Sequence, residues 1–151
     1  MEGGAYPFFT CSREDFRIDR YAFDCEALLL AGNNANADYS VKHFKGKFNA
    51  YQRTYVLTLK NEANNTFAYA KVALERKLTE LKRISKGTNT KYLTLGILGT
   101  LGIQLPPPPL QREFAAQVSA MERLKTAQRA SLAKLDALFA SLQHRAFRGE
   151  L

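Results

Sequence analysis

The chain has 151 residues, of which 46% are hydrophobic and 24% are charged. This composition is that of an ordinary globular domain, and it excludes a disordered chain, a collagen-like repeat and a disulfide-rich scaffold. The 22 Lys and Arg exceed the 14 Asp and Glu, giving a net charge of +8, which favours a polyanionic partner. Residues 40–91 alone hold 12 basic and three acidic side chains, a bias typical of a nucleic-acid or anionic-membrane face.

The first sixty residues predict short strands. A strand is expected at residues 6–11, and the apolar run at 27–31 predicts a buried strand that ends in a turn. Residues 39–44 alternate loosely between apolar and polar, and residues 54–59 are rich in β-branched and aromatic side chains, which favours a further strand. A polar loop is expected at 61–65.

The pattern then changes to a helical period. Apolar residues recur at steps of three and four, which predicts an amphipathic helix through Phe67, Ala70, Leu74, Leu78 and Leu81. Gly87 is placed to end this helix or the turn after it. A short helical segment is expected at 94–98, followed by a strand at 101–105.

Four consecutive prolines at 106–109 favour a stiff extended segment, so residues 106–110 are assigned as a hinge. Residues 111–148 contain neither Gly nor Pro and predict a helix on the order of 50 Å long. Its apolar stripe is too long for the preceding domain to cover and fits a two-stranded coiled coil. The residues assigned to this stripe are Phe114, Val118, Met121, Leu124, Gln128, Leu135, Leu138 and Leu142, with Leu132 and Phe139 beside them.

No catalytic or metal-binding constellation is found in the sequence. His43 and His144 lack neighbouring ligands at metal spacing, and phosphate-binding loops and nucleophile motifs are missing. The glycine-rich run at 96–102 is explained by turns or close packing. We therefore expect no cofactor and no activity of its own. Without a signal peptide or an apolar run long enough for a membrane, a cytoplasmic protein is expected.

Two segments of the basic region carry side chains suited to DNA. Lys and Arg neutralise phosphates, while Arg, Asn and Gln can read base edges. The first segment supplies the candidates Lys42, Lys45, Lys47, Asn49, Tyr51, Gln52 and Arg53, and the second supplies Lys86, Thr88, Asn89 and Lys91. For each segment taken alone, an ordinary solvated loop is the alternative.

The chain resembles, over nearly its whole length, the specificity (S) subunit of type I restriction–modification systems. The C-terminal match is an apolar segment that enters the proline cluster, followed by a long helix ending Phe147-x-Gly149-Glu150-Leu151. The N-terminal match comprises Tyr6-Pro7-Phe8-Phe9, the segment from Tyr21 to Leu29, Gly46-Lys47-Phe48-Asn49-Ala50-Tyr51-Gln52, and the Gly87-Thr88-Asn89 loop.

This resemblance implies an α+β fold. Residues 1–105 would form a small mixed α/β target recognition domain, and residues 111–151 a conserved spacer helix that pairs as an antiparallel coiled coil. The domain would read one half of a split site in double-stranded DNA. Modification subunits, which use S-adenosylmethionine, and a restriction subunit, which uses ATP and Mg, would supply the chemistry.

Complete S subunits carry two recognition domains and two spacer helices, whereas one of each is found here. The resemblance therefore implies a half subunit that forms a homodimer and reads a palindromic split site. The domain is also expected to be short at its front, where the family has one or two further strands. The alternative is an assembly protein that does not bind DNA and docks modification subunits through its helix.

Overall fold

The computed structural model describes residues 3–61 and 65–150. The chain forms two compact units, Met1–Arg112 and Glu113–Leu151, which we call the head unit and the arm unit. Most of the polar loop expected at 61–65 lies outside the described residues.

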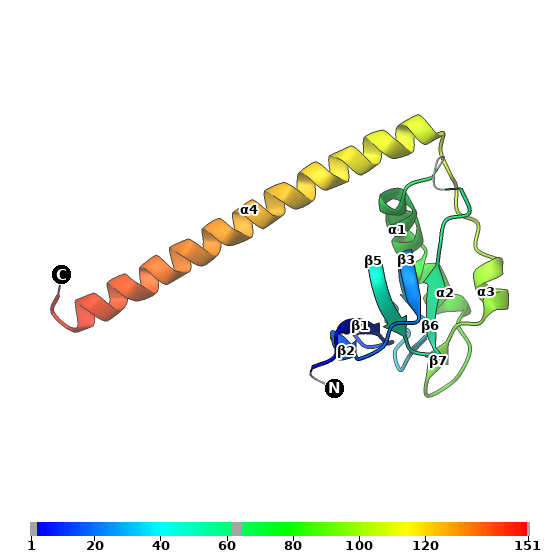
Figure 1. Ribbon diagram of the computed structural model, residues 1–151, viewed down its shortest axis with the longest axis horizontal. Helices are drawn as coiled ribbons and strands as arrows, with labels where there is room; N and C mark the ends of the chain where they lie inside the picture. Colours follow the sequence, from blue (N-terminus) through cyan, green and yellow to red (C-terminus); the bar gives the residue numbers. More distant parts are fainter. Residues whose placement is uncertain (1–2, 62–64, 151) are drawn as a thin grey trace. The chain divides into compact units, whose positions relative to one another are not determined.

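The head unit is built on a five-stranded sheet with the strand order β2-β1-β5-β3-β6 (Figure 1). The strands are β1 (Tyr6–Phe9), β2 (Phe16–Ile18), β3 (Phe23–Ala31), β5 (Val41–Ala50) and β6 (Thr54–Leu57). β3 pairs antiparallel with both β5 and β6, whereas β1 runs parallel to β5. A second, two-stranded sheet joins β4 (Asn33–Asn34) to β7 (Lys91–Tyr92). The strands expected at 6–11, 27–31, 39–44 and 54–59 are thus present with shifted ends, and β2, β4 and β7 are additional.

The helix expected at 67–81 is two helices, α1 (Phe67–Arg76) and α2 (Leu78–Ile84). They separate at Lys77, whose N–H donates to the carbonyl of Leu74, three residues back, in the tighter geometry that ends an α-helix. The hydroxyl of Thr66 accepts a hydrogen bond from the Tyr69 N–H and caps the start of α1.

The short helix expected at 94–98 is α3 (Leu95–Gly99). The strand expected at 101–105 is wrong, because these residues lie in neither a helix nor a strand. Contacts other than strand pairing hold this segment. Leu101 packs against the core, and the carbonyl of Gln104 accepts a hydrogen bond from the Tyr69 hydroxyl.

The core of the head unit lies on both faces of β3. Leu28 and Leu30 pack with residues of α1 and α2 on one face, and Ala27 and Leu29 pack with Phe48 on the other. Successive strand residues point to opposite faces, so an uninterrupted apolar run serves both layers. The run at 27–31 is therefore a strand buried on both sides, as the sequence predicts.

The helix α4 (Pro108–Phe147) begins in the head unit and continues through the arm unit. It starts three residues before the predicted 111, because proline is tolerated in the first turn, where a backbone N–H has no helical partner. Within the arm unit, the stripe residues Met121, Leu124, Leu135, Leu138 and Leu142 are exposed. No helix among the described residues is both long and apolar enough to cross a membrane.

Candidate nucleic-acid interface

Lys42 lies on β5 and is engaged within the head unit. Its Nζ is 3.2 Å from the carbonyl oxygen of Arg13 and 3.3 Å from the carboxylate of Asp15. The side chain is only 25% exposed. Lys42 therefore ties the segment after β1 to the sheet, and its ammonium already has acceptors.

Asn49 has a comparable internal role. Its amide nitrogen donates to the carbonyl of Arg20 at 3.2 Å, and its amide oxygen accepts from the Ala50 N–H at 2.9 Å. These bonds use both ends of the amide to hold the segment before β3 against the end of β5.

Lys45 and Lys47 are more accessible. The Lys45 Nζ lies 3.1 Å from Glu26, which also contacts the His43 Nε2 at 2.9 Å. Burial acts to raise the pKa of Glu26, but the hydrogen bonds from Lys45 and His43 outweigh it and hold the pKa below its ordinary value. The Lys47 ammonium lies 4.7 Å from the centre of the Tyr21 ring, in a cation–π contact. Both lysines are exposed.

The end of the first predicted DNA segment meets the second segment at Gly32, whereas Lys45 and Lys47 lie further along the sheet, opposite Glu26 and Asp24. The Gly32 N–H donates to the carbonyl of Arg53 at 2.9 Å, and the Gly32 carbonyl accepts from the Leu93 N–H at 2.8 Å. A Cβ at Gly32 would lie 2.5 Å from the ring of Tyr55 and 2.8 Å from the carbonyl of Arg53, so this close approach requires glycine. Gly32 thus joins the β5–β6 turn, which carries Tyr51, Gln52 and Arg53, to the end of the 86–92 hairpin.

The 86–92 hairpin presents polar side chains at its turn. Lys86 and Tyr92 pair through two backbone hydrogen bonds, and Gly87 has a φ of 96° that favours glycine. Lys86, Thr88 and Asn89 are exposed, whereas the Lys91 Nζ donates to the Gly87 carbonyl at 2.6 Å. Lys91 therefore stabilises the turn that displays the other three.

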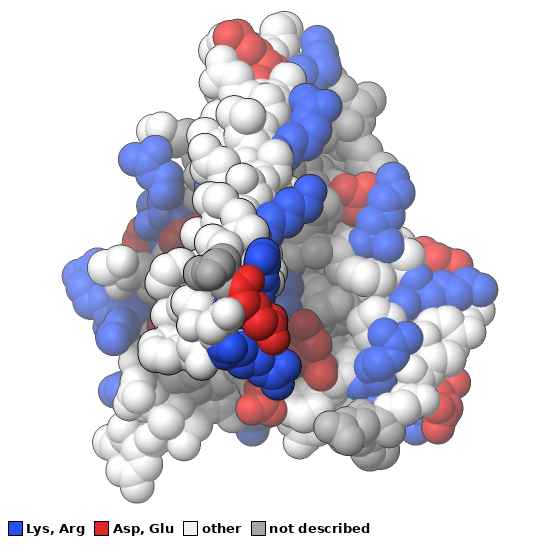
Figure 2. All heavy atoms as spheres, turned by 90° about the vertical axis from the view of Figure 1, so that its left-hand side faces the viewer, with Lys and Arg blue, Asp and Glu red and all other residues white. Residues whose placement is uncertain are grey.

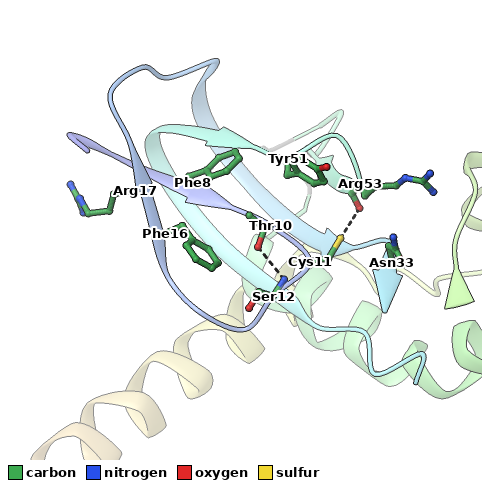
Figure 3. Close-up of a pocket in the computed structure, with 9 residues that line it drawn as sticks. All are labelled: Phe8, Thr10, Cys11, Ser12, Phe16, Arg17, Asn33, Tyr51 and Arg53. Carbon is green, nitrogen blue, oxygen red and sulfur yellow. Dashed lines mark hydrogen bonds between the residues drawn. The ribbon is translucent and has the colours of Figure 1, made fainter. Parts of the chain in front are cut away.

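A groove of about 530 Å³ opens beside the β5–β6 turn (Figure 3). Its walls are mainly apolar, and Figure 3 shows Arg17 and Arg53 at its opposite ends. The lining residues are Phe8, Thr10, Cys11, Ser12, Phe16, Arg17, Asn33, Tyr51 and Arg53. Of these, the sequence predicts Tyr51 and Arg53 as DNA-binding candidates, and Asn33 follows the buried strand at its predicted turn. Phe8 belongs to the Tyr6-Pro7-Phe8-Phe9 motif, for which the sequence predicts no role in a site.

Some basic residues of the middle region have acidic partners. The face drawn in Figure 2 carries both Lys and Arg, in blue, and Asp and Glu, in red. Several are neutralised locally, including Lys71 by Glu75 and Lys77 by Glu80. Within the described ranges, no group of three or more His, Cys, Asp or Glu side chains could hold a metal ion.

Comparisons with known proteins identify the family and support the fold. The family model described as "Type I restriction modification DNA specificity domain" matches residues 2–135. The type I restriction enzyme EcoDI specificity subunit of Escherichia coli is 36% identical over 121 residues, an alignment that covers 78% of this chain and 25% of that protein. The chain therefore spans about a quarter of this curated relative.

A solved structure supports the fold. The S subunit of a type I restriction–modification system from M. genitalium superposes with a TM-score of 0.70 over 83% of this chain and 34% of the other, at 18% sequence identity. A likeness at this identity concerns the fold alone.

Proposed function

The chain belongs to the family of type I restriction modification DNA specificity domains, and from this premise we propose that its head unit recognises one half of a split site in double-stranded DNA. The head unit would read sequence without carrying out chemistry. The observation that carries this proposal is the meeting of the β5–β6 turn with the 86–92 hairpin beside Gly32. Two segments with exposed side chains of the types that contact DNA thereby lie at the same end of the sheet.

The contacts divide into two kinds. Lys45, Lys47 and Lys86 would neutralise phosphates, which gives affinity without sequence information. Arg53, Gln52 and Asn89 are exposed and have the donors and acceptors that distinguish bases in the major groove. Lys42, Asn49 and Lys91 would act indirectly, because their polar atoms hold the surrounding backbone.

The test is a titration of a fluorescent duplex of mixed sequence at several salt concentrations, followed by selection from a pool of randomised duplexes. We expect binding that weakens with salt and enrichment of one short sequence. Replacing Lys47, Arg53 and Lys86 together by Ala should lower affinity and reduce the salt slope by roughly one unit per lost phosphate contact.

The matched control is the replacement of Lys125, Arg129 and Lys134 in the arm unit by Ala, which removes the same charge. It should leave the enriched sequence unchanged. Absence of any binding at low salt by the folded protein would reject DNA recognition by the head unit.

We further propose that the arm unit pairs with a second copy as an antiparallel coiled coil and so separates two recognition heads. The exposed leucines of α4 support this, because such a stripe is normally covered by another helix. The proposal keeps the division into a recognition domain at 1–105, a hinge at 106–110 and a spacer helix at 111–151, with the first turn of α4 inside the hinge. We also propose modification and restriction subunits as partners. The modification subunits would hold S-adenosylmethionine, and the restriction subunit would hold ATP and Mg. The complex would act in the cytoplasm.

Pairing is tested by sedimentation equilibrium of the full chain. The change Leu135→Glu places a charge in the stripe and should convert a dimer to a monomer. Ala133→Glu adds the same charge away from the stripe and should leave the dimer intact. A wild-type monomer at high concentration would contradict self-pairing.

The second candidate function, an assembly protein that docks modification subunits without binding DNA, also draws on the exposed arm. Replacing Lys47, Arg53 and Lys86 together distinguishes the two candidate functions. If the protein is an assembly protein, this change alters neither nucleic-acid binding nor assembly with a modification subunit, whereas a recognition domain loses DNA affinity.

A further inference from the structure

We propose that the groove between Phe8 and Arg53 binds a single nucleobase that has left the stack of the bound DNA. This inference rests on the proposed DNA recognition and assigns a further binding site to the same end of the head unit. The groove has a volume of about 530 Å³, within the range of ~300–1,000 Å³ that is usual for small-molecule sites.

Aromatic rings form the apolar part of the groove. Phe8 and Phe16 are opposite each other in the β1–β2 pair, so their side chains share a face. The Tyr51 ring meets Phe8 edge to face, with 6.5 Å between ring centroids, and the three rings are labelled together in Figure 3. Aromatic side chains of this kind stack on nucleobases of any sequence, because every base presents a flat π-surface.

Two polar side chains at one end of the groove are free to recognise the ligand. Among the described residues, the amide of Asn33 and the guanidinium of Arg53 make no hydrogen bond or ion pair. An amide can pair with the donor–acceptor edge of a base, and a guanidinium can donate to the acceptor atoms of a base edge. The lining residues include two arginines and no carboxylate, so the charge is complementary to a nucleic-acid strand.

The concave shape of this protein groove favours a base that has left the duplex over the edge of a base that is still paired. Base edges lie at the floor of a groove in duplex DNA, and a protein must project into that groove to reach them. A depression on the protein cannot project in this way. A base swung out of the duplex does protrude, and it can enter an aromatic pocket that reads its edge. The neighbouring hairpin, with Lys86, Thr88 and Asn89 exposed, would hold the duplex beside it.

The probe is a pair of hairpin duplexes of identical sequence, one of which carries a single extrahelical 2-aminopurine, a fluorescent adenine analogue whose emission falls when it stacks. The full-length protein should bind the bulged duplex more tightly, on the order of tenfold, because the cost of extrusion is already met. The emission should fall on binding. Tyr51→Ala and Asn33→Ala should each remove most of this preference, whereas Lys134→Ala in the arm unit should leave it unchanged.

The outcomes separate this proposal from DNA recognition itself. Equal affinity for both duplexes with unchanged emission overturns the nucleobase site while DNA binding stands. Binding to neither duplex overturns both. A further experiment adds free deoxyadenosine monophosphate and measures its binding by the loss of Tyr51 fluorescence, with Tyr51→Phe as the reference. If this nucleotide binds and the protein does not prefer the bulged duplex, the ligand is a free nucleotide and the DNA-strand proposal is wrong.

Discussion

Leucines of the head unit and of the arm unit follow similar helical spacing but have opposite exposures. Leu74 and Leu81 of the head unit are 4% and 0% exposed, whereas Leu124 and Leu135 of the arm unit are 65% and 60% exposed. The head unit contains the partners of its apolar residues, because β3 has a covered layer on each face. In the described part of the arm unit, residues 113–150, one helix is present and the leucines of its stripe are exposed. Apolar periodicity therefore predicts which face will be covered, but not whether the cover belongs to the same chain.

The largest expected effect comes from matched leucine truncations. Leu81→Ala should lower the free energy of unfolding of the head unit by about 2–5 kcal/mol, since it leaves a cavity at a fully buried position. Leu124→Ala should change it by less than ~0.5 kcal/mol. All seven tyrosines lie between residues 6 and 92, so tyrosine fluorescence in a denaturant titration follows the head unit specifically. Equal effects of the two changes would contradict the contrast between the units.

The second comparison uses two glutamines of the same helix. Gln111 is 1% exposed; its amide oxygen accepts from the Thr66 N–H at 3.2 Å, and its amide nitrogen donates to the Pro106 carbonyl at 2.8 Å. Gln111→Ala leaves these partly buried backbone groups without their partner and should cost about 1–3 kcal/mol.

Gln117, which is exposed in the arm unit and bonds only weakly to Glu113 at 3.4 Å, is the matched control. Gln117→Ala should have almost no effect on the same tyrosine-detected unfolding. A neutral Gln111→Ala would show that the start of α4 is not fastened to the head unit by this side chain.

Gln111 also shows where prediction from sequence ends. The apolar run at 27–31 and the spacing from Phe67 to Leu81 identify β3 and the α1–α2 face, because periodicity reports which side is buried. A glutamine in a long helix carries no such signal, since its burial depends on Thr66, 45 residues away in sequence. The short strands β2, β4 and β7 escape prediction for the same reason: two or three residues have no period, and their pairing partners are distant.

The candidate site likewise has features that the sequence predicts and contacts that it does not. Residue types in the basic region indicate nucleic acid, and Gly87 indicates the turn that displays Thr88 and Asn89. Sequence does not reveal that Lys42 and Asn49 are already engaged with segments 27 to 29 residues away. It also does not reveal that Asn33 and Phe8 lie beside Tyr51, because strand pairing alone brings them together.

A third comparison contrasts two lysines. Lys42→Ala should destabilise the head unit by about 1 kcal/mol, since it removes hydrogen bonds from a partly buried ammonium. Lys125 lies 2.9 Å from Glu122 in an exposed i,i+3 pair of the arm unit, and Lys125→Ala should cost only ~0.2–0.5 kcal/mol of helix stability. Thermal unfolding followed by tyrosine fluorescence and by circular dichroism separates the two losses. A larger effect of Lys125→Ala would reverse the proposed order.

The smallest effect is a pH dependence located in the head unit. The hydrogen bonds from Lys45 and His43 hold the pKa of Glu26 below its ordinary value, so the unfolded chain binds a proton there more readily than the folded chain does. The stabilisation by ionised Glu26 is therefore fully present above the unfolded pKa of ~4.3 and is lost as the pH falls through the lower folded pKa. Unfolding free energies measured between pH 6 and pH 3 should thus fall more steeply in the wild type than in Glu26→Gln. The difference between the two proteins should be less than ~1 kcal/mol, because the pair is partly exposed.

Parallel curves would assign the acid sensitivity to other carboxylates. A difference seen by circular dichroism but absent from tyrosine fluorescence would place the effect in the arm unit and contradict its assignment to Glu26.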